Sequence, residues 1–297
     1  MAEAACSFPA KVGLFARDIK LSHTLFALPF ALLSTALAWK NSGGPILGKL
    51  LLILGCMIAA RTAAMASNRL LDAALDAVNP RTSGRAIPSG RLSRGFFVAA
   101  IAICCIAFIG VTAGFIYYGN FWPLTLAIPV LAFVCSYPFL KRFTRLCHYY
   151  LGAALGLAPI CAYVAISGRL DWAPLIIAVA VLLWTAGFDI IYACQDYESD
   201  LQTGTISVPA KFGIAGALWI ARLTHVGSAA MLLLLGWYVP WFGTLYYIGA
   251  AAAIALLMVE HSLVSPTDLS KVGIAFFTVN GIISVLLGTL GIIDVLL

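Results

Sequence analysis

Nine stretches of about 20 mostly apolar residues follow one another along the 297-residue chain, and this pattern limits the possible folds more than any other feature. Each stretch is long enough for a helix that crosses a bilayer. The chain is 62% hydrophobic and 10% charged, whereas about a quarter of the residues in a typical soluble domain are charged. We therefore predict an all-α, polytopic membrane protein with nine transmembrane helices. The stretches lie near residues 22–40, 46–72, 95–117, 121–138, 148–167, 172–195, 213–237, 242–261 and 272–294.

The joints between these stretches carry residues that break helices, such as Gly119-Asn120 and Gly168-Arg169. We expect residues 1–297 to form a single membrane domain, in which residues 1–20 precede the first span. The glycines at 152 and 156 indicate close packing between helices.

The basic residues are concentrated in alternate joints. One side holds a large set: Lys11, Arg17, Lys20, Arg81, Arg85, Arg91, Arg94, Lys141, Arg142, Arg145, Lys211 and Lys271. The other side holds Lys40, Lys49 and Arg169. Because positive loops stay in the cytoplasm, we predict an inner (cytoplasmic) membrane protein with a cytoplasmic amino-terminal segment and an external carboxyl terminus. The net charge of +6 then reflects topology, and no patterned basic helix or aromatic platform indicates binding to nucleic acid.

Two apolar stretches end in polar stripes. The segment "NRLLDAALD" contains Asn68, Asp72 and Asp76, and residues four apart share one face of a helix. The segment "FDIIYACQDYESD" contains a second stripe, which consists of Asp189, Tyr192, Asp196 and Asp200. We expect each stripe to run along one helix toward the cytoplasm.

The two aspartate pairs, Asp72 with Asp76 and Asp196 with Asp200, indicate a metal site. A single carboxylate at a helix end is usually solvated at the membrane interface, but four carboxylates at one level repel each other unless a cation lies among them. Mg²⁺ is held by one or two carboxylates together with the phosphates of a substrate. The pattern therefore predicts Mg²⁺ and a substrate that carries a diphosphate.

Basic residues accompany both stripes. The loop "NPRTSGRAIPSG" contains Arg81 and Arg85, and "YPFLKRFTR" contains Lys141, Arg142 and Arg145. Such charges often only set topology, but beside a diphosphate they become its natural partners.

These motifs resemble the UbiA superfamily of intramembrane prenyltransferases. "NRLLDAALD" and "YACQDYESD" are similar to its two aspartate motifs, and "YPFLKRFT", "LGAALG" and "GTISVPAKFG" are similar to segments of its 4-hydroxybenzoate polyprenyltransferases. The resemblance implies a nine-helix bundle around a lipid-open cavity, Mg²⁺, a polyprenyl diphosphate donor and an aromatic carboxylic acid as acceptor. It assigns catalysis and the metal to Asp72, Asp76, Asp196 and Asp200, and the diphosphate to Asn68, Arg81, Arg85, Lys141 and Arg142.

The sequence departs from the family pattern at two positions. Arg69 follows Asn68 where the family often has Asp, and Ile206 stands where a Lys often precedes the loop serine. We expect Lys211 to supply the missing cation to the diphosphate. The segments "LSHTLFALPFALLSTALA" and "SVPAKFG" also look like members of an alternative menaquinone route, so a dihydroxynaphthoate acceptor stays open beside 4-hydroxybenzoate.

Arg61 lies about two helical turns deeper than Asn68 on the same face. An arginine at that depth needs an anion. Its partner is either Asp189 or the carboxylate of the acceptor, and the resemblance supports the acceptor. Asp189 or Tyr192 is expected to orient the acceptor. The four histidines, at positions 23, 148, 225 and 261, share no spacing and are expected to serve packing or the interface.

Two other classes of function compete with the enzyme. In an ion-coupled transporter the intramembrane carboxylates would bind a cation or a proton, and the basic loops would have no ligand. A non-catalytic assembly protein would leave both aspartate stripes unexplained.

Overall fold

The computed structural model describes residues 7–19, 26–44 and 46–297, and the regular structure of these residues is helical. The elements are α1 (Phe8–Asp18), α2 (Leu28–Asn41), α3 (Leu47–Val78), α4 (Arg94–Ala113), η2 (Gly114–Tyr118), α5 (Trp122–Thr125), α6 (Ala127–Leu140), α7 (Cys147–Ser167), α8 (Trp172–Ala193), η3 (Cys194–Asp196), α9 (Tyr197–Thr203), α10 (Val208–Tyr238), α11 (Thr244–Ser262), η4 (Ile274–Val279) and α12 (Asn280–Leu296). The element η4 is one turn of π-helix. This confirms the all-α class.

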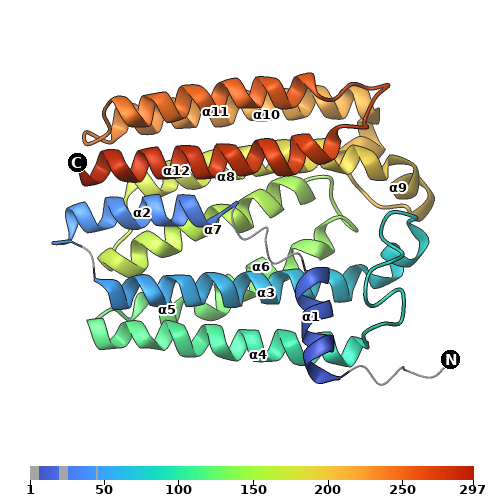
Figure 1. The fold of residues 1–297 in the computed structure, drawn as a ribbon, viewed down its shortest axis with the longest axis horizontal. Coiled ribbons are helices and arrows are strands. Elements are labelled where there is room, and N and C mark those ends of the chain that lie inside the picture. Colours follow the sequence, from blue (N-terminus) through green and yellow to red (C-terminus); the bar gives the residue numbers. More distant parts are fainter. Residues whose placement is uncertain (1–6, 20–25, 45) are drawn as a thin grey trace.

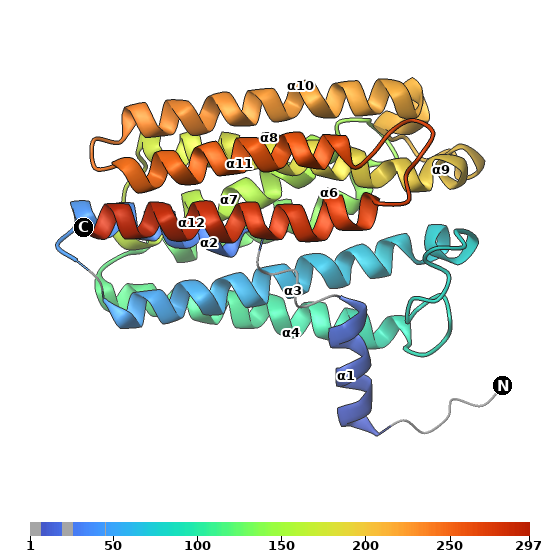
Figure 2. The same cartoon turned by 45° about the horizontal axis from the view of Figure 1, so that its top comes forward.

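The long helices lie side by side with their axes nearly aligned (Figures 1 and 2). The short helix α9 and the loop after α3 lie together at one end of this bundle, and the carboxyl terminus lies at the opposite end (Figure 1). Gly119 and Gly168 end their helices with φ of 73° and 69°, a left-handed conformation that glycine adopts without steric cost. These two breakers therefore act as their sequence context predicts.

Seven helices of the described chain are long and apolar enough to cross a membrane. They are Leu47–Val78, Arg94–Tyr118, Cys147–Ser167, Trp172–Thr203, Val208–Tyr238, Thr244–Ser262 and Ile274–Leu296. The stretch near 121–138 is divided into α5 and the shorter apolar α6, and part of the stretch near 22–40 lies outside the described residues. The chain is thus a multi-pass membrane protein, while a count of nine spans goes beyond what helix length and composition establish.

Helices α7 and α8 pack with almost no space between their backbones. A Cβ atom added at Gly152 would lie 2.2 Å from the carbonyl oxygen of Leu182, and one at Gly156 would lie 2.7 Å from that of Ala178. The expectation of close packing at these glycines is confirmed. This contact fixes α8, which carries the second polar stripe, against the start of α7.

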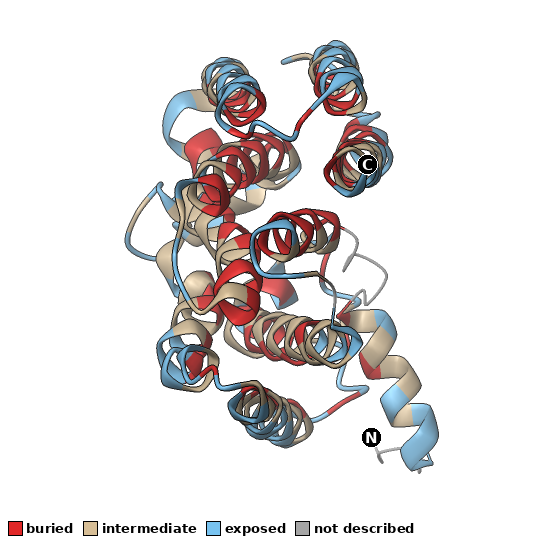
Figure 3. Cartoon of the chain, turned by 90° about the vertical axis from the view of Figure 1, so that its left-hand side faces the viewer, coloured by how far each residue is buried: buried red, intermediate tan, exposed pale blue. Residues whose placement is uncertain are grey.

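Buried residues face the inside of the bundle and exposed residues lie on its outer faces (Figure 3). Many of the exposed side chains are large and apolar, such as Ile106 at 71% exposure and Trp237 at 78%. This is the surface expected of helices in contact with lipid, because apolar side chains cost nothing when they face hydrocarbon.

Candidate active site

A cavity of about 520 Å³ lies within the bundle and joins a polar mouth to an apolar interior. Side chains of α3, α4, α6 and α7, such as Met57, Phe108, Val130 and Leu155, line the apolar part. The lining includes eleven of the residues singled out in the sequence: Arg61, Asn68, Asp72, Asp76, Arg81, Arg85, Lys141, Asp189, Tyr192, Asp196 and Asp200. The fold therefore brings both polar stripes and both basic loops to one site.

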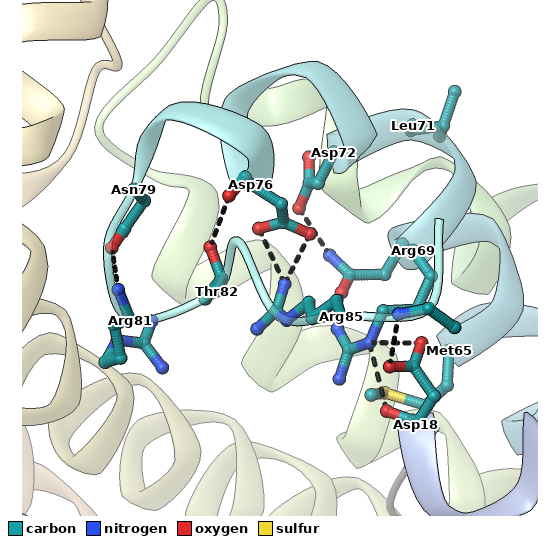
Figure 4. Close-up of polar contacts among 12 residues, drawn as sticks. Asp18, Met65, Arg69, Leu71, Asp72, Asp76, Asn79, Arg81, Thr82 and Arg85 are labelled. Atoms are coloured by element: carbon teal, nitrogen blue, oxygen red, sulfur yellow. Dashed lines mark hydrogen bonds and ion pairs between the residues drawn. The ribbon is translucent and has the colours of Figure 1, made fainter. Parts of the chain in front are cut away.

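The first aspartate pair lies on the last turns of α3, and a cation contacts each carboxylate. Figure 4 shows the contact between Arg85 and Asp76. Asp72 is buried, and its Oδ2 accepts hydrogen bonds from Asn68 Nδ2 at 2.7 Å and from Lys141 Nζ at 2.6 Å. Arg85 Nη1 lies 2.8 Å and 2.7 Å from the two oxygens of Asp76. Charge-assisted contacts of this kind are about twice as strong as neutral hydrogen bonds, so they offset the cost of burying two carboxylates.

The second pair is contacted by the loop that follows α3. Arg81 Nη2 lies 2.5 Å from Asp196 Oδ2, and Asn79 Nδ2 donates to Asp196 Oδ1 at 2.8 Å. Burial lowers the pKa of Arg81, but the hydrogen bond and negative charge of Asp196 raise it more, so that the pKa lies above its ordinary value. Ser207 Oγ donates to Asp200 Oδ2 at 2.7 Å. The loop thus links the two stripes through charge pairs.

The second stripe is not one continuous α-helix, and this part of the prediction was wrong. Helix α8 ends at Ala193, η3 forms a tighter 3₁₀ turn, and α9 starts at Tyr197. Asp189, Asp196 and Asp200 nevertheless all line the cavity, because the short 3₁₀ turn leaves them on the same side of the chain. The switch from α-helix to a 3₁₀ turn depends on the backbone hydrogen bonds at the helix end, and the spacing of the aspartates does not predict it.

Arg69, the first departure from the family pattern, contacts both Asp18 and Asn68 in the structure. Its Nε donates to the backbone oxygen of Asp18 at 3.1 Å and lies 3.6 Å from Asp18 Oδ2, so it ties α3 to the end of α1 (Figure 4). Its Nη1 donates to Asn68 Oδ1 at 2.6 Å. With its oxygen bound in this way, Asn68 presents its NH₂ group to Asp72.

Two predicted diphosphate ligands are not among the residues that line the cavity. Arg142 donates to the backbone oxygen of Leu71 at 2.7 Å, which holds the end of α6 against α3. Lys211 is exposed on the first turn of α10. At the second departure, the Ile206 backbone N–H donates to the carbonyl oxygen of Lys141 at 2.7 Å, so position 206 contributes a backbone contact beside the cation of Lys141.

A further residue of the cavity is His148, which the sequence reasoning placed in a packing role. Its Nδ1 lies 2.7 Å from Asp189 Oδ2, and both residues line the cavity. The expectation that the four histidines serve packing or the interface did not include this contact of His148 with Asp189, and the role of His148 stays a prediction. His225 and His261 contact each other and are not among the residues that line the cavity, and His23 lies outside the described residues. The sequence held one indication of this contact, since His148 lies at the start of α7 and the next helix, α8, carries Asp189. No spacing rule, however, connects residues that are 41 positions apart.

The carboxylates suit a hard divalent cation, although among the described residues no group of three or more Asp, Glu, His or Cys is close enough to hold one alone. Asp72 Oδ1 is buried, and no residue that the structure describes donates a hydrogen bond to it, which is unusual for a carboxylate oxygen. An oxygen of this kind and three further aspartates fit a metal that also takes ligands from a substrate's phosphates.

Taken together, the fold and the site define a multi-pass, all-helical membrane protein in which carboxylates, arginines and a lysine surround the mouth of an apolar cavity. The model of the UbiA prenyltransferase family matches residues 27–282, and the chain belongs to this family.

Curated relatives cover most of the chain. A 4-hydroxybenzoate octaprenyltransferase from Nitrosococcus oceani is 30% identical over 93% of this chain and 91% of its own length. One from Marinobacter nauticus is 31% identical over 85% and 84%.

Solved structures agree on the fold. The apo structure of a UbiA homolog from Aeropyrum pernix K1 superposes with a TM-score of 0.82 at 29% identity, and covers 93% of this chain and 99% of its own. A UbiA homolog from Archaeoglobus fulgidus bound to DMAPP and Mg²⁺ has a TM-score of 0.71 at 18% identity, with 95% and 99% covered.

Proposed function

We propose that this protein transfers a polyprenyl group from a polyprenyl diphosphate to the ring of 4-hydroxybenzoate in quinone biosynthesis. Family membership supports prenyl transfer, and the curated relatives named for 4-hydroxybenzoate support the acceptor. The observation that carries the proposal is the joined cavity, whose mouth holds the charges that a metal diphosphate needs and whose interior is apolar enough for an isoprenoid chain.

The residues of the mouth bind the diphosphate and stabilise the charge that develops on it. Asp72, Asp76, Asp196 and Asp200 would hold Mg²⁺, which supplies electrophilic stabilisation of the departing diphosphate when bound. The structure of the Archaeoglobus fulgidus homolog with DMAPP and Mg²⁺ supports a divalent ion. Arg81, Arg85 and Lys141 contact Asp196, Asp76 and Asp72, and the same three cations would bind the phosphate oxygens of the donor.

Transfer to the acceptor takes place deeper in the cavity than the charged mouth, near Arg61 and Asp189. Departure of the diphosphate breaks the bond between the allylic carbon and oxygen, and the ring carbon beside the hydroxyl then bonds to that carbon. Loss of the ring proton restores aromaticity. Arg61 receives the carboxylate of the acceptor, while Asp189 and Tyr192 orient its ring. The apolar lining excludes water, which would otherwise capture the allylic cation.

We place the protein in the inner membrane with nine spans, in which α2 and the α5–α6 unit join the seven helices that meet the length criterion. The basic loops favour a cytoplasmic site and amino-terminal segment. The position of the carboxyl terminus at the end of the bundle opposite α9 agrees with an odd number of spans.

The competing functions fit the structure less well. A transporter gives the basic loops no role, yet Arg81, Arg85 and Lys141 contact three of the four aspartates. A non-catalytic assembly protein has no use for a cavity lined in this way. A dihydroxynaphthoate would use the same contacts as 4-hydroxybenzoate, so only an assay separates the two acceptors.

The test is to incubate purified protein with octaprenyl diphosphate and Mg²⁺ and to offer 4-hydroxybenzoate or 1,4-dihydroxy-2-naphthoate separately. Mass spectrometry should detect an acceptor heavier by one octaprenyl group with 4-hydroxybenzoate. A product formed with the naphthoate alone would change the acceptor and keep the reaction. No product with either acceptor, at several chain lengths of the donor, would contradict prenyl transfer.

A further inference from the structure

We propose that His148 is a positioning residue for the acceptor, which holds the Asp189 carboxylate ready to bind the ring hydroxyl and connects it to the start of α10, next to the Ser207 that contacts Asp200. This inference rests on the proposed function, whose substrates it uses.

The first step concerns the direction of the hydrogen bonds around the imidazole. The backbone N–H of Val208, the first residue of α10, donates to His148 Nε2 at 3.3 Å. Because Nε2 accepts, it carries a lone pair, and the hydrogen of the neutral ring is then on Nδ1. Nδ1 lies 2.7 Å from Asp189 Oδ2, so His148 donates to Asp189. The side chain of His148 is 4% exposed, and both ring nitrogens have hydrogen-bond partners, which fixes the orientation of the ring.

The second step concerns the oxygen of Asp189 that His148 does not use. The side chain of Asp189 is 24% exposed, against 3% for Asp72, and Asp189 lines the cavity. Its contact with His148 uses Oδ2, so Oδ1 can accept a hydrogen bond from a ligand in the cavity. A carboxylate acts only as an acceptor, and its ligand must therefore bring a hydrogen, as a phenolic hydroxyl does.

The third step excludes the diphosphate as that ligand. Asp189 precedes Asp196 by seven residues along α8 and η3, which places it about 10 Å deeper in the cavity at roughly 1.5 Å per residue. A phosphate oxygen placed against Asp189 Oδ1 would be repelled by the carboxylate, because both carry negative charge. Aromatic side chains surround this level instead: Phe188 and Phe276 are in edge contact at 5.1 Å, and Tyr192 lies against Phe276 at 4.1 Å with a tilt of 34°. An aromatic ring that carries a hydroxyl fits these surroundings.

The fourth step connects this layer with the mouth. Val208 follows Ser207, whose Oγ caps α10 by accepting from the Ala210 N–H at 3.2 Å and donates to Asp200 at 2.7 Å. The imidazole of His148 therefore connects Asp189 to Val208, the residue directly after the Ser207 that contacts Asp200.

The test compares His148→Leu with His148→Gln, because glutamine has both a donor and an acceptor group and leucine has neither. The readout is the ratio of the dissociation constants of benzoate and 4-hydroxybenzoate, both measured without a prenyl donor so that neither acid reacts, and this ratio isolates the contact with the hydroxyl. The wild-type protein should bind the hydroxylated acid at least about tenfold more tightly. His148→Leu should lower this ratio by about tenfold, and His148→Gln should recover part of it, while the donor KM changes less than twofold in both.

His225→Leu is the matched control, since His225 is a buried histidine of the bundle that does not line the cavity. It should leave the ratio unchanged even if thermal stability falls. An unchanged ratio in a folded His148→Leu protein would overturn the proposal, as would equal losses in the control. Loss of all product in the wild-type protein would instead overturn the proposed function, and the two failures are therefore distinguishable. If His148→Leu does not fold, Asp189→Asn replaces it, and a preserved ratio in that protein would also overturn the proposal.

Discussion

Two aspartates at the mouth of the cavity each contact a cation: Asp72 contacts Lys141, and Asp196 contacts Arg81. The proposed mechanism needs both carboxylates to hold Mg²⁺. Asp72→Asn and Asp196→Asn should each lower kcat by at least about 100-fold, the loss typical of one missing charge-stabilising contact. The proteins should still fold, since asparagine keeps the hydrogen-bonding shape. Product formation followed by mass spectrometry, with and without a chelator of divalent ions, measures the effect.

Asp268→Asn is the control for this pair of variants. Asp268 is an exposed carboxylate in the loop after α11 and does not line the cavity. It should retain full activity. Full activity of Asp72→Asn or Asp196→Asn, or of the wild-type protein in excess chelator, would rule out the metal-diphosphate mechanism.

Arg61 lies in the deeper layer, about 10 Å from Asn68 along α3. If its guanidinium binds the carboxylate of the acceptor through contacts that contribute roughly 1.5–3 kcal/mol, Arg61→Met should raise the acceptor KM by about one to two orders of magnitude. The donor KM should hardly change. The comparison of the free acid with its uncharged ester checks the contact, because only the wild-type protein should prefer the acid.

Arg222→Met controls for the loss of any cation from a membrane helix. Arg222 lies over the ring of Trp219, 4.9 Å from its centroid, and is not part of the cavity lining. It should keep the preference for the acid. If Arg61→Met raises both KM values and lowers the melting temperature, Arg61 serves the fold and the carboxylate is bound elsewhere.

The contact between α7 and α8 sets the position of the second stripe. A methyl group at Gly152 would meet a backbone carbonyl at 2.2 Å, which no side-chain movement can relieve. We expect Gly152→Ala to lower the free energy of unfolding by about 1–3 kcal/mol, as overpacking does, and to reduce kcat because α8 carries Asp189. Thermal unfolding in detergent and the activity assay measure both effects.

Gly110→Ala is the matched glycine substitution, since Gly110 lies in α4 with open space around its Cβ position. Alanine favours a helix by up to about 1 kcal/mol over glycine, so stability should hold or rise. A stable and fully active Gly152→Ala protein would show that the helices can separate without displacing the site.

The whole molecule has one end that is rich in charge and one that is not. We expect single cysteines at positions 85 and 142 to react with a membrane-impermeant reagent from the same side, and a cysteine at position 297 to react from the other. Labelling of intact and of inverted vesicles, in a background without other reactive cysteines, measures this. Reaction of positions 85 and 142 from opposite sides would contradict the proposed arrangement.

The class of fold could be predicted from the sequence because a helix that crosses a bilayer needs about 20 mostly apolar residues, and such stretches recur along this chain. In lipid, a helix satisfies the hydrogen bonds of its backbone within one segment of chain. The apolar stretches near 95–117 and 148–167 accordingly coincide with helices to within a few residues. The sequence also predicted that Asp72 and Asp76 share one face of a helix, because residues four apart lie on the same face of a regular α-helix.

The tertiary structure alone decided which residues meet across helices. His148 and Asp189 are 41 positions apart, and Arg81 and Asp196 are 115 apart, so no local period connects them. The same holds for Arg142 and Lys211, whose charges looked equivalent to that of Lys141 along the chain but do not line the cavity. The sequence by itself determined the all-α membrane class and the residue types on the two polar stripes, since both depend on local composition and spacing. The packing of α7 on α8 and the turn at η3 determined which residues surround Asp189, because they depend on contacts that form only when distant helices pack together.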